Sequence, residues 1–498
     1  MPRLLSKLIV LAVGSSTASA LAGDCDLWSV VPSPNPAGVE DVFLRDVVAI
    51  SSDDVWAVGD WRDTGFNNYT FAMHWDGAAW TIVPTPSPPP YAGGKPYCQL
   101  LAVDALGPND VWAAGTQKIP GANGFIGPQT LVLHWNGATW SEVPSPLTPP
   151  GTSGALIRDV LAFASDEIWF VGADTVPLYS PALAMRWTGS GFVKTTPPQV
   201  NTDGQNLNAI AALSKNDVWA VGGSKAGGST IERYLCHWDG SSWTHVPSPK
   251  PGLKHEFFDV AAIAPNDVWA SGEQVRNDGS YAHLLMHWDG SAWSGHVPTS
   301  GGTRSLLAFG PNDVYGGGGG GVHHYDGATW SPCEDFPTVQ WPVVWKMART
   351  PEGGIWAVGY QGGTTARTFV ARMEPKAAGC VGSGGFTPKL SLSGVPVAGQ
   401  QLGVSVSDGL GGAAAVFFFG AGLASVPMNG GCSLRVAPLF PASFSVPLGG
   451  SGPGNGSLTL SAVLPPSLAG TSFGMQVFVA DGGAPAGFSN TNAVQLNP

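Results

Sequence analysis

Five histidines occupy one repeated position of this sequence, and histidine is the commonest side-chain ligand for transition metals. They are His74, His134, His237, His287 and His324, and Arg186 and Arg372 stand at the same position of two further repeats. A shared metal site would need rings within about 2 Å of one ion. If each repeat forms its own sheet, equivalent rings lie roughly 10 Å apart or more, because neighbouring strands are about 4.8 Å apart. We therefore predict no metal and no cofactor, and expect these histidines to form hydrogen bonds between neighbouring sheets.

Acidic residues recur at one position in six of the seven repeats. They are Asp54, Asp110, Glu167, Asp217, Asp267 and Asp313. Calcium loops would need clustered carboxylates with D-x-D-x-D-G spacing, which this sequence lacks. Acidic side chains in short turns commonly accept hydrogen bonds from nearby backbone N–H groups. The repeated acids are therefore predicted to cap turns.

Catalytic motifs are nearly absent. The segment Gly470–Gly474 matches G-x-S-x-G, but no helical pattern follows it and no histidine occurs after His324, so a hydrolase triad in the order Ser, Asp, His cannot form. We predict that the protein is not an enzyme. One alternative stays open, because a glycosidase needs only two carboxylates about 5–10 Å apart. Loop acids that could supply such a pair are Asp60, Asp63, Asp174, Glu256, Asp278 and Glu334.

The composition favours strands and turns. The 498 residues include 69 Gly, 43 Pro and 20 Trp, and only 12% are charged. A net charge of −12 disfavours nucleic acid as a partner. Residues 1–22 are typical of a secretory signal peptide, with Arg3 and Lys7 before the apolar run Leu8–Val13. We expect a secreted or cell-surface protein, a monomer without a membrane span.

An internal repeat dominates residues 24–375. The segment Asp54–Gly59, D-V-W-A-V-G, recurs in seven copies whose aromatic residues are 41–57 residues apart, a period typical of β-propellers. Each unit divides into four short strands, here called a to d, joined by turn residues such as Asn216-Asp217 and Asp239-Gly240. The sequence predicts an all-β fold, a seven-bladed β-propeller.

The outer strand d carries a W-x-x-V-P pattern that is missing from the last repeat. The missing copy stands at the other end of the chain, as Leu27–Pro34. We therefore expect the Trp28 segment to add a strand to the last sheet, beside Phe369 and Val370, and so to close the ring. Cys25 and Cys380 flank this junction and are predicted to form a disulfide.

The remaining cysteines are less informative. Cys236 stands where other repeats have Met or Leu, so we expect a buried thiol. The pairing of Cys98, Cys333 and Cys432 is left open.

After the repeats the composition changes. Residues 376–385 are predicted to be a Gly/Ser linker, and residues 386–498 contain only four charged groups. Strand-like runs separated by Gly- and Pro-rich turns predict a small antiparallel β-sandwich there.

These motifs also resemble known families. The unit N-D-V-W-A-V-G followed by H-W-D-G-x-x-W, as in Asn216–Gly222 and His237–Trp243, resembles the repeats of secreted bacterial β-propellers and, more distantly, kelch, Asp-box and tectonin blades. The segment Asp76–Trp80 is one residue short of an Asp-box. The segment Gly487–Val494 resembles the end of C-terminal modules of planctomycete-like secreted proteins. The resemblance implies a fold and no particular activity.

Loop lengths predict where a ligand binds. The a–b and c–d turns are short and uniform, whereas the b–c and d–a loops on the opposite side of the ring are long and irregular. We call these the turn side and the loop side. Candidate ligand-binding residues on the loop side are Trp61, Arg62, Tyr69, Tyr91, Tyr97, Tyr179, Arg276, Tyr281, Trp341 and Tyr360. Aromatic and arginine side chains suit a glycan or a protein, so we expect a binding scaffold, with a polysaccharide hydrolase or lyase and a structural envelope protein as alternatives.

Overall fold

The computed structural model describes residues 28–496 apart from internal gaps. These gaps are residues 88–94, 121–125, 146–153, 176–180, 202, 226–230, 250–253, 276–279, 297–302, 311–312, 326, 334–338, 340–341, 352, 363–364, 374–379, 381, 394–396, 429–431, 470 and 485. The predicted signal peptide and the side chain of Cys25 lie outside the described residues. The chain separates into two compact units, one of which is Cys25–Lys376. No helix in the described part of the chain is long and apolar enough to cross a membrane.

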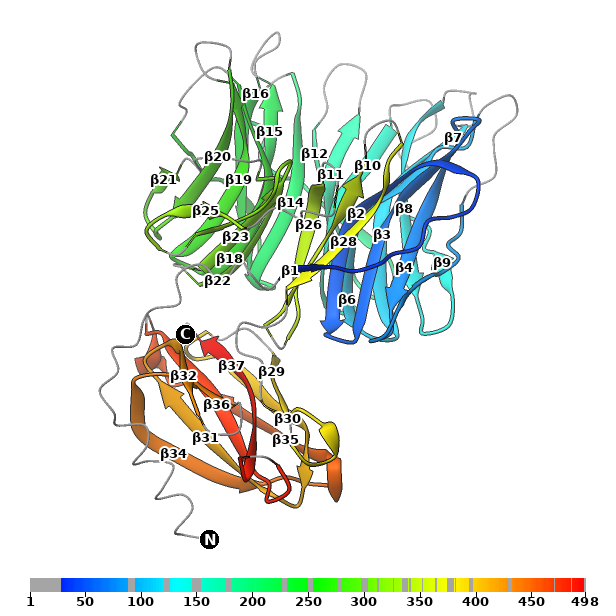
Figure 1. Ribbon diagram of the computed structural model, residues 1–498. Helices are drawn as coiled ribbons and strands as arrows, with labels where there is room; N and C mark the ends of the chain where they lie inside the picture. Colours follow the sequence, from blue (N-terminus) through cyan, green and yellow to red (C-terminus); the bar gives the residue numbers. More distant parts are fainter. Residues whose placement is uncertain are drawn as a thin grey trace. The chain divides into compact units, whose positions relative to one another are not determined.

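The first unit consists of four-stranded antiparallel sheets, seven of them within the described residues (Figure 1). Sheets 1 to 3 are β2(Val39–Ser51)–β3(Asp54–Asp63)–β4(Asn68–Trp75)–β5(Trp80–Ile82); β6(Cys98–Gly107)–β7(Asp110–Pro120)–β8(Ile126–Trp135)–β9(Trp140–Glu142); and β10(Gly154–Ala164)–β11(Glu167–Thr175)–β12(Ala182–Trp187)–β13(Phe192–Thr195). Sheets 4 and 5 are β14(Gln205–Ser214)–β15(Asp217–Lys225)–β16(Ile231–Trp238)–β17(Trp243–His245) and β18(Lys254–Ala264)–β19(Asp267–Val275)–β20(Tyr281–Trp288)–β21(Trp293–His296). Sheet 6 is β22(Ser305–Gly310)–β23(Asp313–Gly318)–β24(Gly321–Tyr325)–β25(Trp330–Pro332), and sheet 7 is β26(Val343–Arg349)–β27(Ile355–Gln361)–β28(Arg367–Met373)–β1(Trp28–Val30).

The sheets form a ring, because the inner strand of each contacts the inner strand of the next and β26 contacts β2. The all-β propeller fold predicted from the repeats is confirmed. The predicted closing strand is also confirmed: β1 pairs with β28, with Trp28 opposite Met373, and Val31 N donates to Val370 O at 2.9 Å. The ring is therefore closed by pairing between its first and last strands, which leaves no free edge on β28.

The repeated tryptophans join neighbouring sheets. The ring of Trp56 in sheet 1 lies 4.9 Å from that of Trp135 and 5.3 Å from that of Trp140 in sheet 2. Equivalent contacts follow around the ring, between Trp112 and Trp187, Trp169 and Trp238, Trp219 and Trp288, Trp269 and Tyr325, and Trp356 and Trp75. Trp28 packs with Tyr315 in the cluster between sheets 6 and 7. The tryptophans thus form the core between sheets, as hydrophobic burial of large aromatic side chains favours.

The repeated histidines bond within their own sheet, so the predicted bonds between sheets were wrong. His74 Nε2 lies 2.8 Å from Asp54 Oδ1, and its ring lies 4.5 Å from that of Trp56. The other pairs are His134–Asp110, His237–Asp217, His287–Asp267 and His324–Asp313. The register explains this pairing, because His74 stands opposite Trp56, and Asp54 lies two residues before Trp56 on the same face.

The prediction that the repeated acids cap turns was wrong, because their hydrogen bonds are to histidine, arginine and tryptophan side chains of the same sheet. Asp54 accepts from His74, and Asp110 accepts both from His134 and from the indole N–H of Trp112 at 2.8 Å. In two of the a–b turns the capping oxygen belongs to a serine instead: Ser51 Oγ accepts from Asp53 N, and Ser214 Oγ accepts from Asn216 N.

The second unit is also all-β. Its sheets are β29(Lys389–Ser393)–β30(Gln401–Gly411)–β35(Gly452–Val463), β34(Leu439–Pro447)–β31(Ala414–Gly420)–β36(Phe473–Ala480)–β37(Phe488–Leu496) and β32(Leu423–Pro427)–β33(Ser433–Val436), with short 3-10 helices η2(Ser383–Gly385) and η4(Pro466–Leu468). One apolar cluster joins the first two sheets and includes Leu402, Phe417 and Val477. An apolar cavity of about 160 Å³ adjoins it, beside Phe419 and Phe444.

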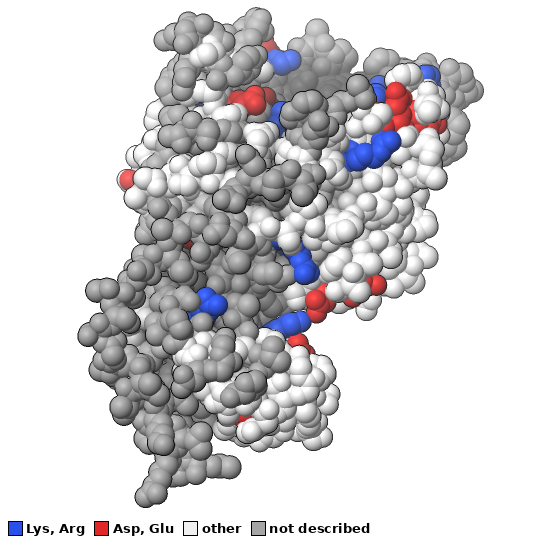
Figure 2. Space-filling view, in the orientation of Figure 1, with Lys and Arg blue, Asp and Glu red and all other residues white. Residues whose placement is uncertain are grey.

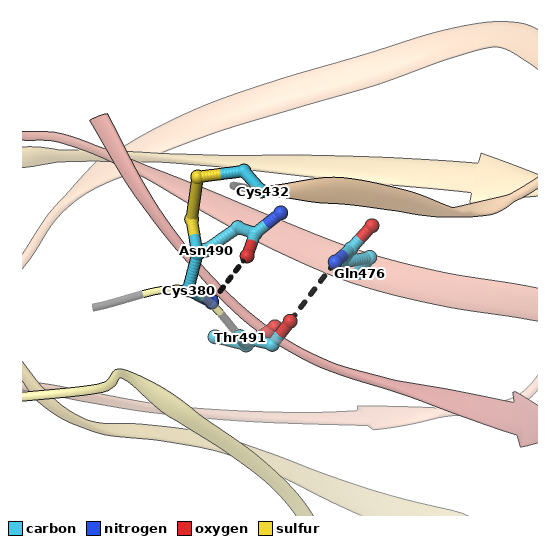
Figure 3. Close-up of a disulfide and its surroundings, with 5 residues drawn as sticks. All are labelled: Cys380, Cys432, Gln476, Asn490 and Thr491. Carbon is cyan, nitrogen blue, oxygen red and sulfur yellow. Dashed lines mark hydrogen bonds between the residues drawn. A yellow bond between two sulfur atoms is a disulfide. The ribbon is translucent and has the colours of Figure 1, made fainter. Parts of the chain in front are cut away.

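The predicted Cys25–Cys380 disulfide was wrong, because Cys380 is bonded to Cys432 within the second unit (Figure 3). Their Cα atoms are 5.1 Å apart, and Cys380 N donates to Asn490 Oδ1 at 2.7 Å. The bridge therefore ties the beginning of this unit to its own sheets. Cys333 is also disulfide-bonded. Cys98 and Cys236 are buried free thiols, as predicted for Cys236, and burial raises the pKa of Cys236 to about 12.

Candidate binding site at the axis of the ring

The inner strand of each sheet carries one side chain with some exposure at an equivalent position, which in six of the sheets is a β-bulge. Six inner strands shift register at the same point of the repeat, and the residue at the shift has no direct partner on strand b. In sheet 6 the equivalent residue directly precedes Ser305. We call these seven residues the axial rim: Arg45, Leu101, Arg158, Asn208, Phe258, Arg304 and Trp345. All seven are partly or fully exposed, whereas the residue after each is buried in six of the seven sheets.

The glycine that ends the D-V-W-A-V-G motif makes the bulge possible. A Cβ atom on Gly222 would lie 2.0 Å from Asn206 O, on the backbone of the neighbouring inner strand. The same close approach occurs at the motif glycine of each of the other five bulged sheets, namely Gly59, Gly115, Gly172, Gly272 and Gly359. The motif glycine therefore allows the backbone approach that accompanies the bulge.

The arginines of the rim are held against aromatic rings. The guanidinium carbon of Arg45 lies 4.7 Å from the ring centroid of Trp345, and that of Arg304 lies 4.9 Å from it. Since the two arginines come from the sheets on either side of sheet 7, we infer that they cover opposite faces of the indole. Arg304 also lies 5.0 Å from the ring of Phe258. Such contacts stabilise a guanidinium group by about 0.5–2 kcal/mol and fix its orientation.

The rim carries more positive charge than its immediate partners neutralise. Arg45 Nε donates to Asp60 Oδ1 at 2.8 Å. The side chain of Arg158 reaches solvent, but protein atoms surround much of its guanidinium group, and this desolvation lowers its pKa against the opposing charge of Glu256. Arg304 forms no ion pair with the acids of the described residues. On the face drawn in Figure 2, charged side chains are few among the described residues.

A buried layer of carboxylates lies next to the rim. Asp46 Oδ2 accepts from Val103 N of sheet 2, Asp104 Oδ2 from Ala162 N of sheet 3, and Asp159 Oδ2 from Ile210 N of sheet 4. Burial raises the pKa of Asp46 well above its ordinary range, that of Asp104 to about 7 and that of Asp159 to about 6. Burial opposes the charge on Lys346, but Asp259, Asp159 and Asp46 outweigh it and raise the pKa of the lysine. These groups link neighbouring sheets at the axis.

Of the predicted ligand-binding residues, five have described side chains, and they fall into three places. Trp61 and Tyr69 stack on each other at 4.4 Å in sheet 1, where Arg62 pairs with Asp41. Tyr97 donates to Gln99 Oε1 at 2.9 Å. Tyr360 lies beside the rim, 5.1 Å from Phe43 and 6.2 Å from Trp345. Tyr91, Tyr179, Arg276 and Trp341 lie outside the described residues, and only the backbone of Tyr281 is described, in β20.

Sequence reasoning missed the rim itself, because it searched the loops and not the inner strands. A signal was present in the repeat: the residue before Asp46, Asp159 and Asp259 is Arg45, Arg158 and Phe258. Aligning the repeats on their motif glycines would have placed these residues at one equivalent position.

The loop carboxylates considered for a glycosidase are engaged elsewhere where they are described. Asp60 pairs with Arg45, Asp174 with Lys194, and Glu256 accepts from Asn208 Nδ2 at 2.9 Å. Hydrogen bonds from Asn67 lower the pKa of Asp63. Asp278 and Glu334 lie outside the described residues. In the part of the chain that the structure describes, no cluster of His, Cys, Asp or Glu could hold a metal ion.

Comparisons with known proteins found similar solved structures only. No family model matches the chain, and no curated protein matches its sequence. Among solved structures, YCF48 bound to D1 peptide is 16% identical with a TM-score of 0.44, and the match covers 72% of this chain and 99% of the other. YCF48 from Cyanidioschyzon merolae is 14% identical with a TM-score of 0.45, covering 70% and 99%. The GH74 xyloglucanase from Xanthomonas campestris is 12% identical with a TM-score of 0.39, covering 93% and 81%. These values describe a similarity of fold alone.

Proposed function

We propose that this chain is a secreted, monomeric, seven-bladed propeller that binds an extracellular protein or glycan on its loop side and does not catalyse a reaction. The observation that carries the proposal is the axial rim. Each of the seven sheets contributes one side chain at an equivalent position, within the inner strand or directly before it, and three of these are arginines and two are aromatic. Arginine and aromatic side chains dominate binding hot spots. Sites of this kind lie at the ends of rigid scaffolds, where loops meet.

The loop side supports the same function beyond the rim. Trp61, Arg62, Tyr69 and Tyr97 are partly exposed and lie at the loop ends of sheets 1 and 2. Their contacts with one another and with Asp41 and Gln99 hold them in place before any ligand arrives, which lowers the entropic cost of binding. The second unit, which we propose is a β-sandwich, serves as an accessory or attachment module.

A binding experiment on glycan and peptide arrays tests this function. The full chain after the predicted signal peptide is applied to both arrays, beside Trp61→Ala on the loop side and Ser241→Ala in a c–d turn. We expect binding on at least one array, weakened about tenfold or more by Trp61→Ala, as truncation of a hot spot predicts, and unchanged by Ser241→Ala. The proposal would be contradicted by no binding on either array, by equal effects of the two variants on binding, or by turnover of an arrayed polysaccharide.

A further inference from the structure

The axial rim has the chemistry of a carboxylate receptor. Three of its seven positions are arginine and none is acidic. Arg304 has no carboxylate partner among the described residues, and the ion pair of Arg45 with Asp60 uses only Nε, which leaves the terminal nitrogens of Arg45 out of that pair. A guanidinium group presents N–H donors in a planar fork that matches the two oxygens of a carboxylate.

The donors are also held in position. Trp345 fixes Arg45 and Arg304 at 4.7 and 4.9 Å, and Phe258 adds a second ring beside Arg304. Arg45, Arg158 and Trp345 lie on inner strands, and Arg304 directly precedes β22, where its N–H donates to Gly317 O at 2.7 Å. A site of this kind loses little side-chain entropy when a ligand binds.

The same contacts argue against a sugar at this position. A sugar ring stacks on an open aromatic face, but guanidinium groups already cover Trp345, and Arg304 lies over Phe258. Tyr360 meets Phe43 edge to face at 78°. Asn206 and Asn208 donate to Glu256, whose charge acts on Arg158. Amide and carboxylate groups of this kind can bond to peptide N–H and C=O groups.

The buried acids limit how far an anion can enter. Asp46, Asp159 and Asp259 follow directly after the rim residues of their strands, and Lys346 is the cation on which their charges act. A carboxylate that passed the rim would meet these acids, so it is stopped at the arginines.

Resting on the loop-side function proposed above, we propose that the axial rim binds the carboxylate groups of an acidic peptide segment of the partner protein, held by Arg304, Arg158 and Arg45.

Titration calorimetry with the full chain tests this assignment. The probes are hexaglutamate, the uncharged hexaglutamine and tri-galacturonic acid. The variants are Arg304→Gln and Arg158→Gln, and the matched control is Lys215→Gln, an exposed cation in an a–b turn on the other side of the ring. We expect hexaglutamate alone to bind, with affinity about tenfold lower in each arginine variant and unchanged in Lys215→Gln, and falling as salt rises.

Several results would overturn the inference: no binding of hexaglutamate, equal binding of hexaglutamine, tighter binding of tri-galacturonic acid, or arginine variants that bind hexaglutamate as the parent does. Thermal unfolding of each variant shows whether it is folded, and Trp345→Phe gives a second variant, expected to weaken binding less than loss of an arginine. The loop-side function is tested independently by the array experiment. That experiment depends on the Trp61 variant and does not require the ligand to be acidic, so either proposal can fail without the other.

Discussion

At the scale of single residues, the axis of the ring is organised by carboxylates that bond to backbone N–H groups on two neighbouring sheets. Asp104 accepts from Ala105 N at 2.8 Å and from Ala162 N at 2.7 Å. These bonds favour the ionised form, but burial outweighs them and raises the pKa of Asp104 to about 7. The aspartates of the c–d turns behave in the opposite way: Asp239 is exposed, and hydrogen bonds from Ser241 and Ser242 lower its pKa to about 2.

The raised pKa values of the buried carboxyl groups predict that the free energy of unfolding of the propeller decreases as pH rises from mildly acidic to mildly alkaline. The contribution of a carboxyl group whose pKa is raised on folding is fully present below its ordinary pKa and is lost as pH rises through the folded value, here about 6 to 7. We expect the free energy of unfolding to fall by about 1–3 kcal/mol between pH 5 and pH 8. Asp104→Asn should unfold more easily at pH 5 but show a smaller fall, measured by denaturant titration at each pH.

The control for this prediction is Asp239→Asn. Its stabilising contribution is lost only as pH falls toward about 2, so the slope between pH 5 and pH 8 should not change. An Asp104→Asn variant with the slope of the parent would contradict the assignment.

At the scale of the element, one glycine per repeat decides the course of the inner strand. The motif glycine lets the carbonyl of the inner strand approach, and the bulge then turns one side chain toward the axis. The same glycine is therefore needed both for the course of the inner strand and for the position of the rim side chain.

Gly222→Ala is expected to destabilise the propeller by about 1–3 kcal/mol, because its Cβ would lie 2.0 Å from a backbone oxygen that cannot move alone. Gly295→Ala in β21 is the matched control, since nothing lies within 4 Å of an added Cβ there. Denaturant titration of both variants measures the difference. Equal stabilities would mean that the bulge does not depend on the glycine.

At the scale of the whole molecule, the ring depends on a contact between residues more than 300 positions apart. Trp28 packs against the cluster that holds Tyr315 and Met373, while Ser33 Oγ lies 2.8 Å from Thr368 Oγ1, a pair 335 residues apart in the chain. The closing strand β1 has only three residues. We therefore expect side-chain packing to contribute much of the free energy that holds the ring closed.

Trp28→Ala should lower the free energy of unfolding by about 2–4 kcal/mol, as truncation of a partly buried tryptophan predicts. Amide exchange of β28 should become faster, because its edge would open. Val30→Ala, at a side chain that is 38% exposed in the same strand, should change stability by less than about 0.5 kcal/mol. Exchange of β28 at the same rate in both variants would show that β1 does not hold the ring closed.

The repeat, the four-stranded unit, the all-β propeller and the N-terminal strand that closes it could all be predicted from the sequence. Each of these follows from local patterning and from counting outer strands. Only the tertiary structure decided which side chains meet: Arg45, Arg304 and Trp345 are far apart in the chain and come together because closure of the ring brings the inner strands to one axis. The pairing of Cys380 with Cys432 was decided in the same way, since a disulfide requires Cα atoms close together, here 5.1 Å apart, and position beside a junction in the sequence does not measure that distance.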